Sequence, residues 1–356
     1  MRKQVERFCE RFGLRVPILL APMAGVPAPS LSANIAAAGG LGACGVLLMQ
    51  PDEIGQWAQT FVRATGANAF QLNNWIPDPP PQRDEHHEAA VREFLAQWGP
   101  AVPAEAANAR PPDFQAQCQA MLDAKPRAIS STMGVYPSNM VSEMQKRSIL
   151  WLANATTVAE ARVAEQAGAD FIVAQGMEAG GHRGSFDNHN AEAQTVGLFA
   201  LLPAIIDAVR VPVIATGAIG DARGIAAAFL LGASAVQIGT GFLRCPEAEM
   251  PPAWADALAR TMPEDTVLTR AFSGRAGRAL VTDYVRAATA PKPDTPGPAP
   301  YPVQRGLTAA MRKKAAEAGD LQRMQAWAGQ SARLARKEPA GELVNRLWRE
   351  ASELLG

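Results

Sequence analysis

The sequence lacks the features that mark membrane, secreted and nucleic-acid-binding proteins. No apolar run approaches the roughly 20 residues of a membrane span, and the first residues are charged rather than apolar like a signal peptide. Its 34 basic residues balance its 34 acidic ones. The chain therefore lacks the excess of positive charge that is typical of nucleic-acid-binding proteins. The four cysteines, Cys9, Cys44, Cys118 and Cys245, form no CxxC pair. We therefore expect a cytoplasmic protein that binds small molecules and has no nucleic-acid or membrane partner.

Several catalytic motifs are also missing. The 356 residues contain no GxxxxGK[ST] phosphate loop and no GxGxxG at Rossmann spacing. They contain no GxSxG nucleophile elbow and no HExxH metal motif. We therefore expect neither a Rossmann-bound dinucleotide nor ATP, no Ser-His-Asp hydrolase and no metal site.

What the sequence does contain is a regular alternation of short apolar runs with helical segments. Eight β-branched or small apolar runs lie at 16–23, 41–47, 67–73, 128–134, 149–154, 170–174, 211–215 and 235–238. Helices are predicted between them at 31–38, 52–63, 139–146, 157–168, 194–209 and 221–231, with Ser30, Asp52, Thr157 and Asp221 as N-caps. This alternation favours an α/β fold, a closed (β/α)8 TIM barrel.

The alternation is interrupted once and ends before the C-terminus. A proline-rich loop and helical segments at 85–98 and 113–124 suggest an insertion near 74–125. Beyond Leu243 come a proline-rich linker at 290–302 and helices at 308–318, 321–328 and 341–355. We predict a barrel over residues 1–243 and a mostly helical C-terminal part over 244–356 that folds as a cap onto the barrel mouth.

Two glycine-rich loops follow the seventh and eighth predicted strands. They are Thr216 to Gly220 and Gly239 to Gly241. In (β/α)8 barrels these positions commonly bind phosphate, because close-approach glycines and helix N-termini present free backbone N–H groups. The pair favours a phosphate monoester on a mononucleotide cofactor, with ordinary structural turns as the alternative.

The stretch from Gln175 to Gly184, QGMEAGGHRG, follows the sixth predicted strand and holds the one histidine with a clear functional context. His86 and His87 lie on a charged helix and His189 in a polar run, whereas His182 follows two glycines at a strand end. Other strand ends supply Met23, Asn73 and Gln175, whose sulfur and amides suit a flat heteroaromatic ring. We predict a loop at residues 176–184 that carries the chemistry.

These residues resemble the nitronate monooxygenases, also called 2-nitropropane dioxygenases. The resemblance rests on five elements: Ala21–Gly25, Ala38–Gly42, Gln175–Gly184, Thr216–Ile219 and Gln237–Thr240, with Arg270–Arg275 and Trp327–Gln330 as later matches. It implies a TIM barrel with non-covalent FMN and a helical cap. One departure is Asn74 in Asn73-Asn74-Trp75, since the family more often has an apolar residue directly after Asn73.

The resemblance also implies site residues. His182 would be catalytic and face the substrate. Cofactor-binding residues would be Ala21, Pro22, Met23, Ala24, Asn73, Gln175, Gly180, Gly181, Gly217, Gln237, Ile238, Gly239 and Thr240, the last four near the phosphate. Tyr301 and Trp327 are candidates for shaping the pocket or for packing.

The implied activity is the FMN-dependent oxidation of alkyl nitronates, and of nitroalkanes as a further candidate, with O2 to carbonyl compounds and nitrite. An NAD(P)H-dependent flavin reductase acting on a quinone or enoyl thioester is the second hypothesis. A non-catalytic flavin-binding barrel is the third. The sequence contains no indication of oligomeric state.

Overall fold

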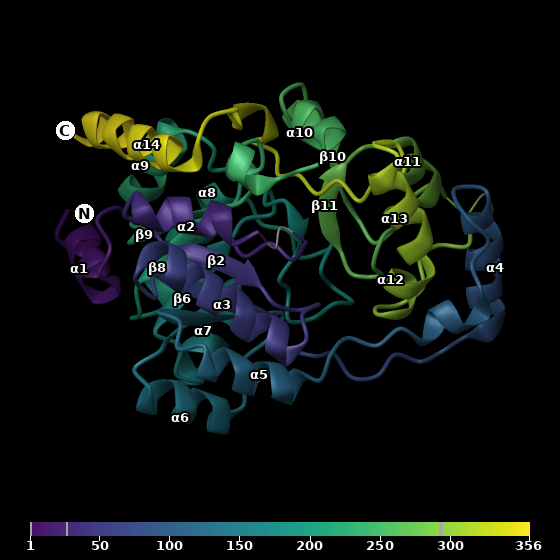
Figure 1. Ribbon diagram of the computed structural model, residues 1–356, viewed down its shortest axis with the longest axis horizontal. Helices are drawn as coiled ribbons and strands as arrows, with labels where there is room; N and C mark the ends of the chain where they lie inside the picture. The colour runs from purple at the N-terminus through teal and green to yellow at the C-terminus, as the bar shows by residue number, and fades with distance from the viewer. Residues whose placement is uncertain (1, 26–27, 292, 294) are drawn as a thin grey trace.

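Eight parallel strands form the nearly closed barrel at the centre of the molecule (Figure 1). The computed structural model describes residues 2–25, 28–291, 293 and 295–356; Val26 and Pro27 of the first predicted loop lie outside these ranges, as do residues 292 and 294 of the linker. The strands follow the order β1-β9-β8-β6-β5-β4-β3-β2. Leu20 N–H donates to the Leu41 carbonyl over 2.9 Å, and Leu41 N–H to the Ile18 carbonyl over 3.1 Å. These bonds join β1 to the start of β2, so the predicted (β/α)8 barrel is confirmed.

The strand and helix bounds lie close to the predicted ones. The barrel strands are β1 (Ile18–Leu20), β2 (Gly42–Gly45), β3 (Phe70–Trp75), β4 (Ala128–Thr132), β5 (Leu150–Ala155), β6 (Phe171–Gln175), β8 (Val213–Thr216) and β9 (Ala235–Ile238). The helices around them are α2 (Pro29–Ala37), α3 (Pro51–Thr65), α5 (Phe114–Asp123), α6 (Ser138–Lys146), α7 (Val158–Gln166), α8 (Leu198–Ala208) and α9 (Ala222–Leu230). Helix α14 (Ala340–Leu355) packs on α9 and α2.

Two predicted N-caps are confirmed and two are wrong. The side chains of Thr157 and Asp221 accept backbone N–H groups at the starts of α7 and α9. Helices α2 and α3 instead begin at Pro29 and Pro51, one residue before the predicted caps Ser30 and Asp52. Proline is favoured at the first helical position because its φ is already helical and its missing N–H is not needed there.

A second difference concerns the start of α8. The helix begins at Leu198, not at the predicted Gln194. The reason is a tertiary contact, because the Glu178 carboxylate accepts the Leu198 N–H at 2.9 and 3.0 Å. A carboxylate at a helix N-terminus stabilises the helix from that residue onward.

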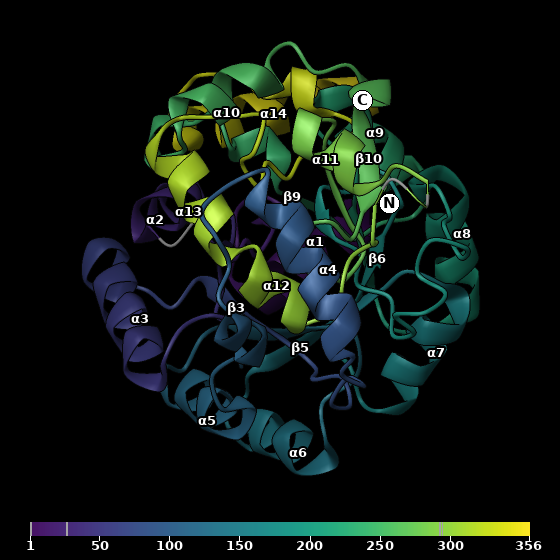
Figure 2. The same cartoon turned by 90° about the vertical axis from the view of Figure 1, so that its right-hand side faces the viewer.

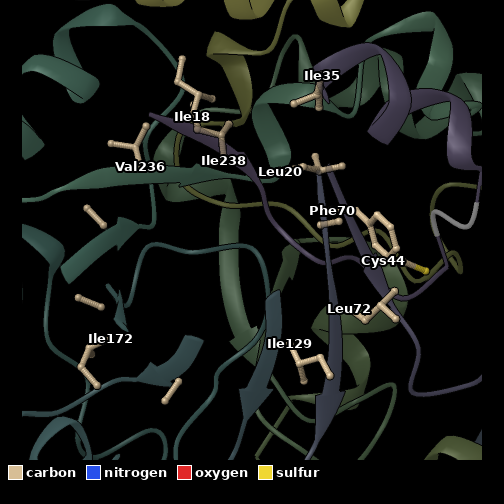
Figure 3. Packing of buried hydrophobic residues seen from close by; sticks show 14 of the residues in the cluster. Ile18, Leu20, Ile35, Cys44, Phe70, Leu72, Ile129, Ile172, Val236 and Ile238 are labelled. Carbon is tan, nitrogen blue, oxygen red and sulfur yellow. The ribbon is translucent and has the colours of Figure 1, made fainter. Parts of the chain in front are cut away.

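The barrel core has an inner and an outer layer, as the strand period of two requires. In β1, Ile18 and Leu20 pack with Ile35 of α2 in the outer layer (Figure 3). Leu19 belongs to the inner layer, together with Phe171. Helix α1 (Arg2–Phe12), which the pattern of the sequence did not predict, contributes Phe8 and Phe12 to this inner layer. It therefore covers the end of the barrel remote from the glycine loops (Figure 1).

The other end of the barrel is covered by elements from two distant parts of the chain. One part is the insertion, with α4 (Glu85–Ala96) and the 3-10 helix η1 (Ala104–Asn108). The other comes from the C-terminal part, with α10 (Pro252–Leu258), α11 (Asp283–Ala288), α12 (Val303–Leu307) and α13 (Ala309–Glu317). Figure 2, which looks onto this end, shows α4 and α12 across the middle of the ring. We call these elements the cap.

The C-terminal part is mostly helical, as predicted, but it also contains a small sheet. Strands β10 (Thr266–Thr269) and β11 (Gly277–Leu280) form an antiparallel sheet with β7 (Gly181–His182). The predicted helix at 321–328 is wrong, because Trp327 instead forms a bridge with Ala279. The backbone conformation of this segment is therefore set by its pairing with β11 and not by its local helix propensity.

The cap has its own hydrophobic core, shared by both of its parts. Val91 and Leu95 of α4 pack in one cluster with Phe272, Tyr284 and Leu307. Within the described residues, no helix has both the length and the apolar character that a membrane crossing requires.

The Phe272→Ala substitution should destabilise the protein strongly, because Phe272 is fully buried and its removal leaves a cavity. We expect a loss of about 3–5 kcal/mol in the free energy of unfolding, measured by urea denaturation. The matched control is Phe199→Ala on α8, where the ring is 74% exposed and the expected change is below about 0.5 kcal/mol. Equal losses in the two variants would contradict a packed cap core.

Candidate active site

A cavity of about 620 Å³ lies at the carboxyl ends of the barrel strands, beneath the cap. Its lining includes these sequence-predicted cofactor residues: Ala21, Pro22, Met23, Ala24, Asn73, Gln175, Gly180, Gly181, Gly217, Gln237, Gly239 and Thr240, together with His182. Ile238 is the exception, since its side chain is buried in the outer core layer (Figure 3). The strand ends therefore gather nearly all of these residues around one space.

The loop after β8 has a backbone suited to an anion. Gly217 has φ +121° and Ala218 has φ +52°, two consecutive residues in a region that side chains rarely adopt. Within the described part of the chain, neither residue makes a hydrogen bond. Their N–H groups are therefore free for a ligand such as a phosphate.

The loop after β9 is fastened to the C-terminal part of the chain. Thr240 Oγ1 accepts the Gly329 N–H over 3.0 Å. Gly180 lies at the same contact, and a Cβ built on it would come within 2.5 Å of the Gly329 nitrogen. Glycine at 180 is thus required by the close approach of two backbone segments.

The side-chain amides of Gln175 and Asn73 form hydrogen bonds with neighbouring residues of the site. Gln175 Oε1 accepts the Gly184 N–H at 2.7 Å, and its Nε2 donates to the His182 carbonyl at 3.1 Å. Asn73 Nδ2 donates to the hydroxyls of Ser130 and Thr132 at 3.0 and 3.1 Å. Gln175 thereby holds the backbone from the His182 carbonyl to Gly184.

His182 lies on the short strand β7 and not in the predicted loop. Its backbone pairs with Gly277 of β11. Its ring lies between Trp75 and Trp327, at centroid distances of 4.6 and 4.8 Å. The Nε2 atom is 2.7 Å from Ser273 Oγ. Pairing, packing and this hydrogen bond fix the imidazole on the cavity wall.

The surroundings of His182 keep its ring neutral. Burial, followed by the positive charges of Arg305, Arg275 and Arg312, lowers the pKa of His182 to about 3. The neutral ring has one N–H and one lone pair, and the Ser273 hydroxyl can accept a hydrogen bond from the N–H or donate one to the lone pair. The ring is therefore a weak base and not a cation at neutral pH.

Arg275 joins the site to the insertion. Its guanidinium, which is buried, forms an ion pair with Asp78 at 2.7 Å and donates to the Ser185 carbonyl at 3.2 Å. Asp78 lies in the proline-rich loop after β3. This pair compensates one of the three positive charges near His182.

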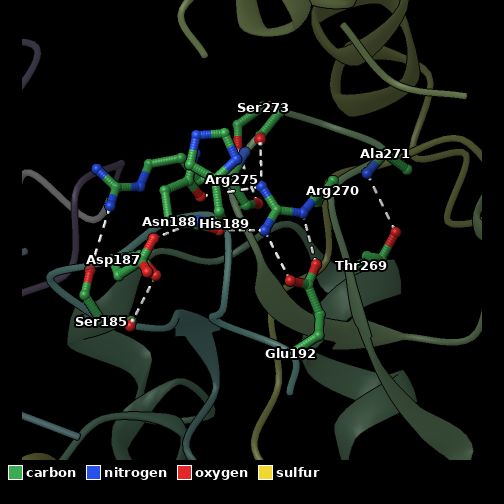
Figure 4. A network of polar contacts seen from close by, with 11 residues as sticks. Ser185, Asp187, Asn188, His189, Glu192, Thr269, Arg270, Ala271, Ser273 and Arg275 are labelled. Atoms are coloured by element: carbon green, nitrogen blue, oxygen red, sulfur yellow. Dashed lines mark hydrogen bonds and ion pairs between the residues drawn. The ribbon is translucent and has the colours of Figure 1, made fainter. Parts of the chain in front are cut away.

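A second arginine fastens the loop that follows His182 (Figure 4). Arg270 forms an ion pair with Glu192 at 2.5 Å and donates to the side chain of Asn188 at 2.9 Å. The segment from Ser185 to Glu192 is thereby tied to the turn between β10 and β11. The turn that carries Ser273 is thus held on both sides.

The contacts of Ser273, Arg275 and Arg305 with the site are not predicted from the sequence, in which Arg270–Arg275 is only a later match to the family. Arginines beside a serine were the available signal. The pairing of β11 with β7, which brings this turn to the site, is a long-range property. Trp75, at the end of β3, packs against His182, Tyr301 packs against Trp75, and Trp327 packs against His182.

The cavity fits a flat cofactor with a phosphate tail. Its volume is in the range of about 300–1,000 Å³ of small-molecule sites, and its lining combines apolar side chains with convergent amides and glycines. The free N–H groups at Gly217 and Ala218 suit the phosphate. Trp254 Nε1, at the cavity wall, is buried without a partner among the described residues, which leaves a donor for a ligand.

Comparisons with known proteins agree with this description. The family model for nitronate monooxygenase matches residues 7–350. A nitronate monooxygenase of Paraburkholderia phytofirmans is 38% identical over 350 residues, with 96% of this chain and 93% of that protein covered. Among solved structures, the nitroalkane oxidase of Streptomyces ansochromogenes has a TM-score of 0.87 at 36% identity, covering 96% of both chains. FabK from Thermotoga maritima has a TM-score of 0.76 at 27% identity, covering 98% of this chain and 96% of that one.

The matches extend over the barrel, the insertion and the C-terminal part alike. The chain is therefore an oxidoreductase that belongs to the nitronate monooxygenase family.

Proposed function

We propose that the protein binds FMN without a covalent bond and oxidises alkyl nitronates with O2 to carbonyl compounds and nitrite. The observation that carries this proposal is a neutral imidazole fixed in the wall of a cavity that also holds the free N–H groups of the loop after β8. The family matches support a nitronate as the substrate. Bound FMN would supply the electron-transfer chemistry, which no side chain of the cavity can provide.

The residues around the cavity have separate roles in this proposal. The loops after β8 and β9, with Gly217, Gly239 and Thr240, would hold the phosphate. Met23, Asn73, Gln175, Gly180 and Gly181 would line the ring. The cap, folded over the mouth, would exclude water from the reacting atoms.

The neutral, weakly basic ring of His182 favours a nitronate over a nitroalkane as the substrate. A nitroalkane must lose its α-proton before oxidation, and an imidazole with a pKa of about 3 is a weak base for that step. A nitronate is already the conjugate base and needs no proton acceptor. We therefore propose that His182 orients a preformed nitronate by hydrogen bonding and removes a proton only from the slower substrate, the nitroalkane.

The direct test is anaerobic mixing of the FMN-loaded protein with ethyl nitronate and, separately, with NADH and NADPH. We expect loss of the oxidised flavin absorbance with the nitronate and none, or a much slower loss, with the nicotinamides. Rapid bleaching by a nicotinamide alone would indicate an NAD(P)H-dependent reductase. Bleaching by none of the three would indicate a non-catalytic flavin-binding barrel.

The His182→Asn variant should separate the two substrates. A general base contributes about 10²–10⁴-fold to proton removal, so we expect kcat/KM for nitroethane to fall by that factor. The value for preformed ethyl nitronate should fall less, because no proton is removed. His189→Asn is the matched control, since His189 is exposed and outside the cavity. Unchanged turnover of both substrates by the His182 variant would contradict a role in catalysis.

The low pKa of His182 also predicts the pH dependence. The ring stays neutral at pH 8 and at pH 5 and gains a proton only as the pH falls toward about 3. We expect kcat/KM for preformed ethyl nitronate, measured by rapid mixing, to show no step near the ordinary histidine pKa of about 6.5. A decrease centred there that disappears in His182→Asn would show that the ring titrates normally.

A further inference from the structure

The cap brings positive charge to the cavity wall near His182 without acidic partners. Arg305, Arg312 and Lys313 line the cavity, and Glu249 is the one acidic residue in its described lining. Glu249 is exposed and forms no ion pair among the described residues. The cavity therefore carries an excess of positive charge on the cap side.

Arg312 is held rigidly by neutral groups. Its guanidinium donates to Thr308 Oγ1 at 3.0 Å, to Gln325 Oε1 at 3.0 Å and to the Arg305 carbonyl at 2.9 Å. Burial without a counter-charge lowers the pKa of Arg312 to about 10. Each of its three nitrogens donates one of these bonds, and its charge stays uncompensated.

Arg305 differs from Arg312 because its side chain has no partner. Within the described residues, its guanidinium makes neither a hydrogen bond nor an ion pair, although the residue is half-buried. Burial lowers its pKa. A guanidinium in the cavity lining with five unused N–H donors can bind acceptor atoms of a ligand.

The free guanidinium lies close to the reacting region. Among the positive charges that act on His182, that of Arg305 has the largest effect. Arg275, the next in effect, is already paired with Asp78. The uncompensated field at the imidazole thus comes from Arg305 and, behind it, Arg312.

We propose that Arg305 binds the anionic oxygens of the substrate and so selects the nitronate over the neutral nitroalkane, an inference that rests on the proposed function. A nitronate group is planar and shares its negative charge between two oxygens. The planar guanidinium fork matches such a pair in bidentate fashion, as it does a carboxylate. Arg312 would position Arg305 by holding its backbone carbonyl.

The Arg305→Gln substitution is well suited as a test, because it removes no hydrogen bond or ion pair that the described residues make with this side chain. The matched control is Lys314→Gln, which removes a positive charge from the exposed face of α13, outside the cavity. Both variants should unfold at the wild-type urea concentration and retain FMN. Loss of FMN by the Arg305 variant would assign this arginine to the cofactor phosphate and overturn the proposal.

The first readout is anion binding without turnover. Nitrate is planar like a nitronate and is not a substrate, so its binding to the FMN-loaded protein can be followed by isothermal titration calorimetry. A hydrogen bond to a charged group contributes about 1.5–3 kcal/mol, so we expect the dissociation constant to rise about 10- to 150-fold in Arg305→Gln. The Lys314 control should match the wild type. No nitrate binding to the wild type, or equal binding to Arg305→Gln, would overturn the proposal.

The second readout compares a conjugate pair of ligands with the same heavy atoms. Arg305→Gln should raise the KM for ethyl nitronate by a similar factor and leave the apparent affinity for neutral nitroethane within about threefold of the wild type. Arg305→Lys should restore part of the loss. Equal effects on both ligands would overturn selection by charge.

The two readouts distinguish this inference from the proposed function. Nitrate binding that depends on Arg305, in a protein that does not oxidise nitronates, would support the anion site and contradict the proposed nitronate oxidation. If Arg305→Gln oxidised nitronates as efficiently as the wild type, the proposed function would be supported and the anion site would be contradicted.

Discussion

The arrangement of the active site depends on a two-residue antiparallel pairing between β7 and β11. Gly181 and His182 pair with Arg278 and Gly277, and this short ladder joins the segment after β6 to the C-terminal part of the chain. It brings Ser273 to within 2.7 Å of the imidazole and Arg275 to the ion pair with Asp78. Because paired strands fix register, a one-residue slip would turn His182 away from the cavity.

The barrel and the cap contribute different physical components. The barrel provides a rigid frame whose strand ends supply glycines and free backbone N–H groups, which suit a phosphate and a flat ring. The cap provides aromatic rings and uncompensated positive charge, which suit an anionic substrate. The insertion and the C-terminal part share one hydrophobic core, so the positions of Asp78, Ser273 and Arg305 relative to His182 depend on the same packing.

Local sequence patterns were sufficient for the barrel and insufficient for the cap. Strand period and strand-end glycines are short-range signals, and they located the eight barrel strands. The sheet of β10, β11 and β7 was missed because its strands have only four, four and two residues, too few to show a strand alternation. The pairing of β7 with β11 comes from contacts between residues almost 100 positions apart. The error at 321–328 has the same origin, since Trp327 is held by Ala279. Ile238 was assigned to the cofactor by its motif, but in a strand its side chain points to the opposite layer from its neighbours.

The central claim is that the loops after β8 and β9 and the strand ends form one site for a flavin with a phosphate. The most direct measurement is equilibrium titration of the flavin-free protein with FMN and with riboflavin, followed by flavin fluorescence. The account predicts one FMN per chain and a dissociation constant for riboflavin at least about tenfold higher, since charge-assisted hydrogen bonds to the phosphate are lost. Equal affinities, or no binding of either flavin, would contradict it.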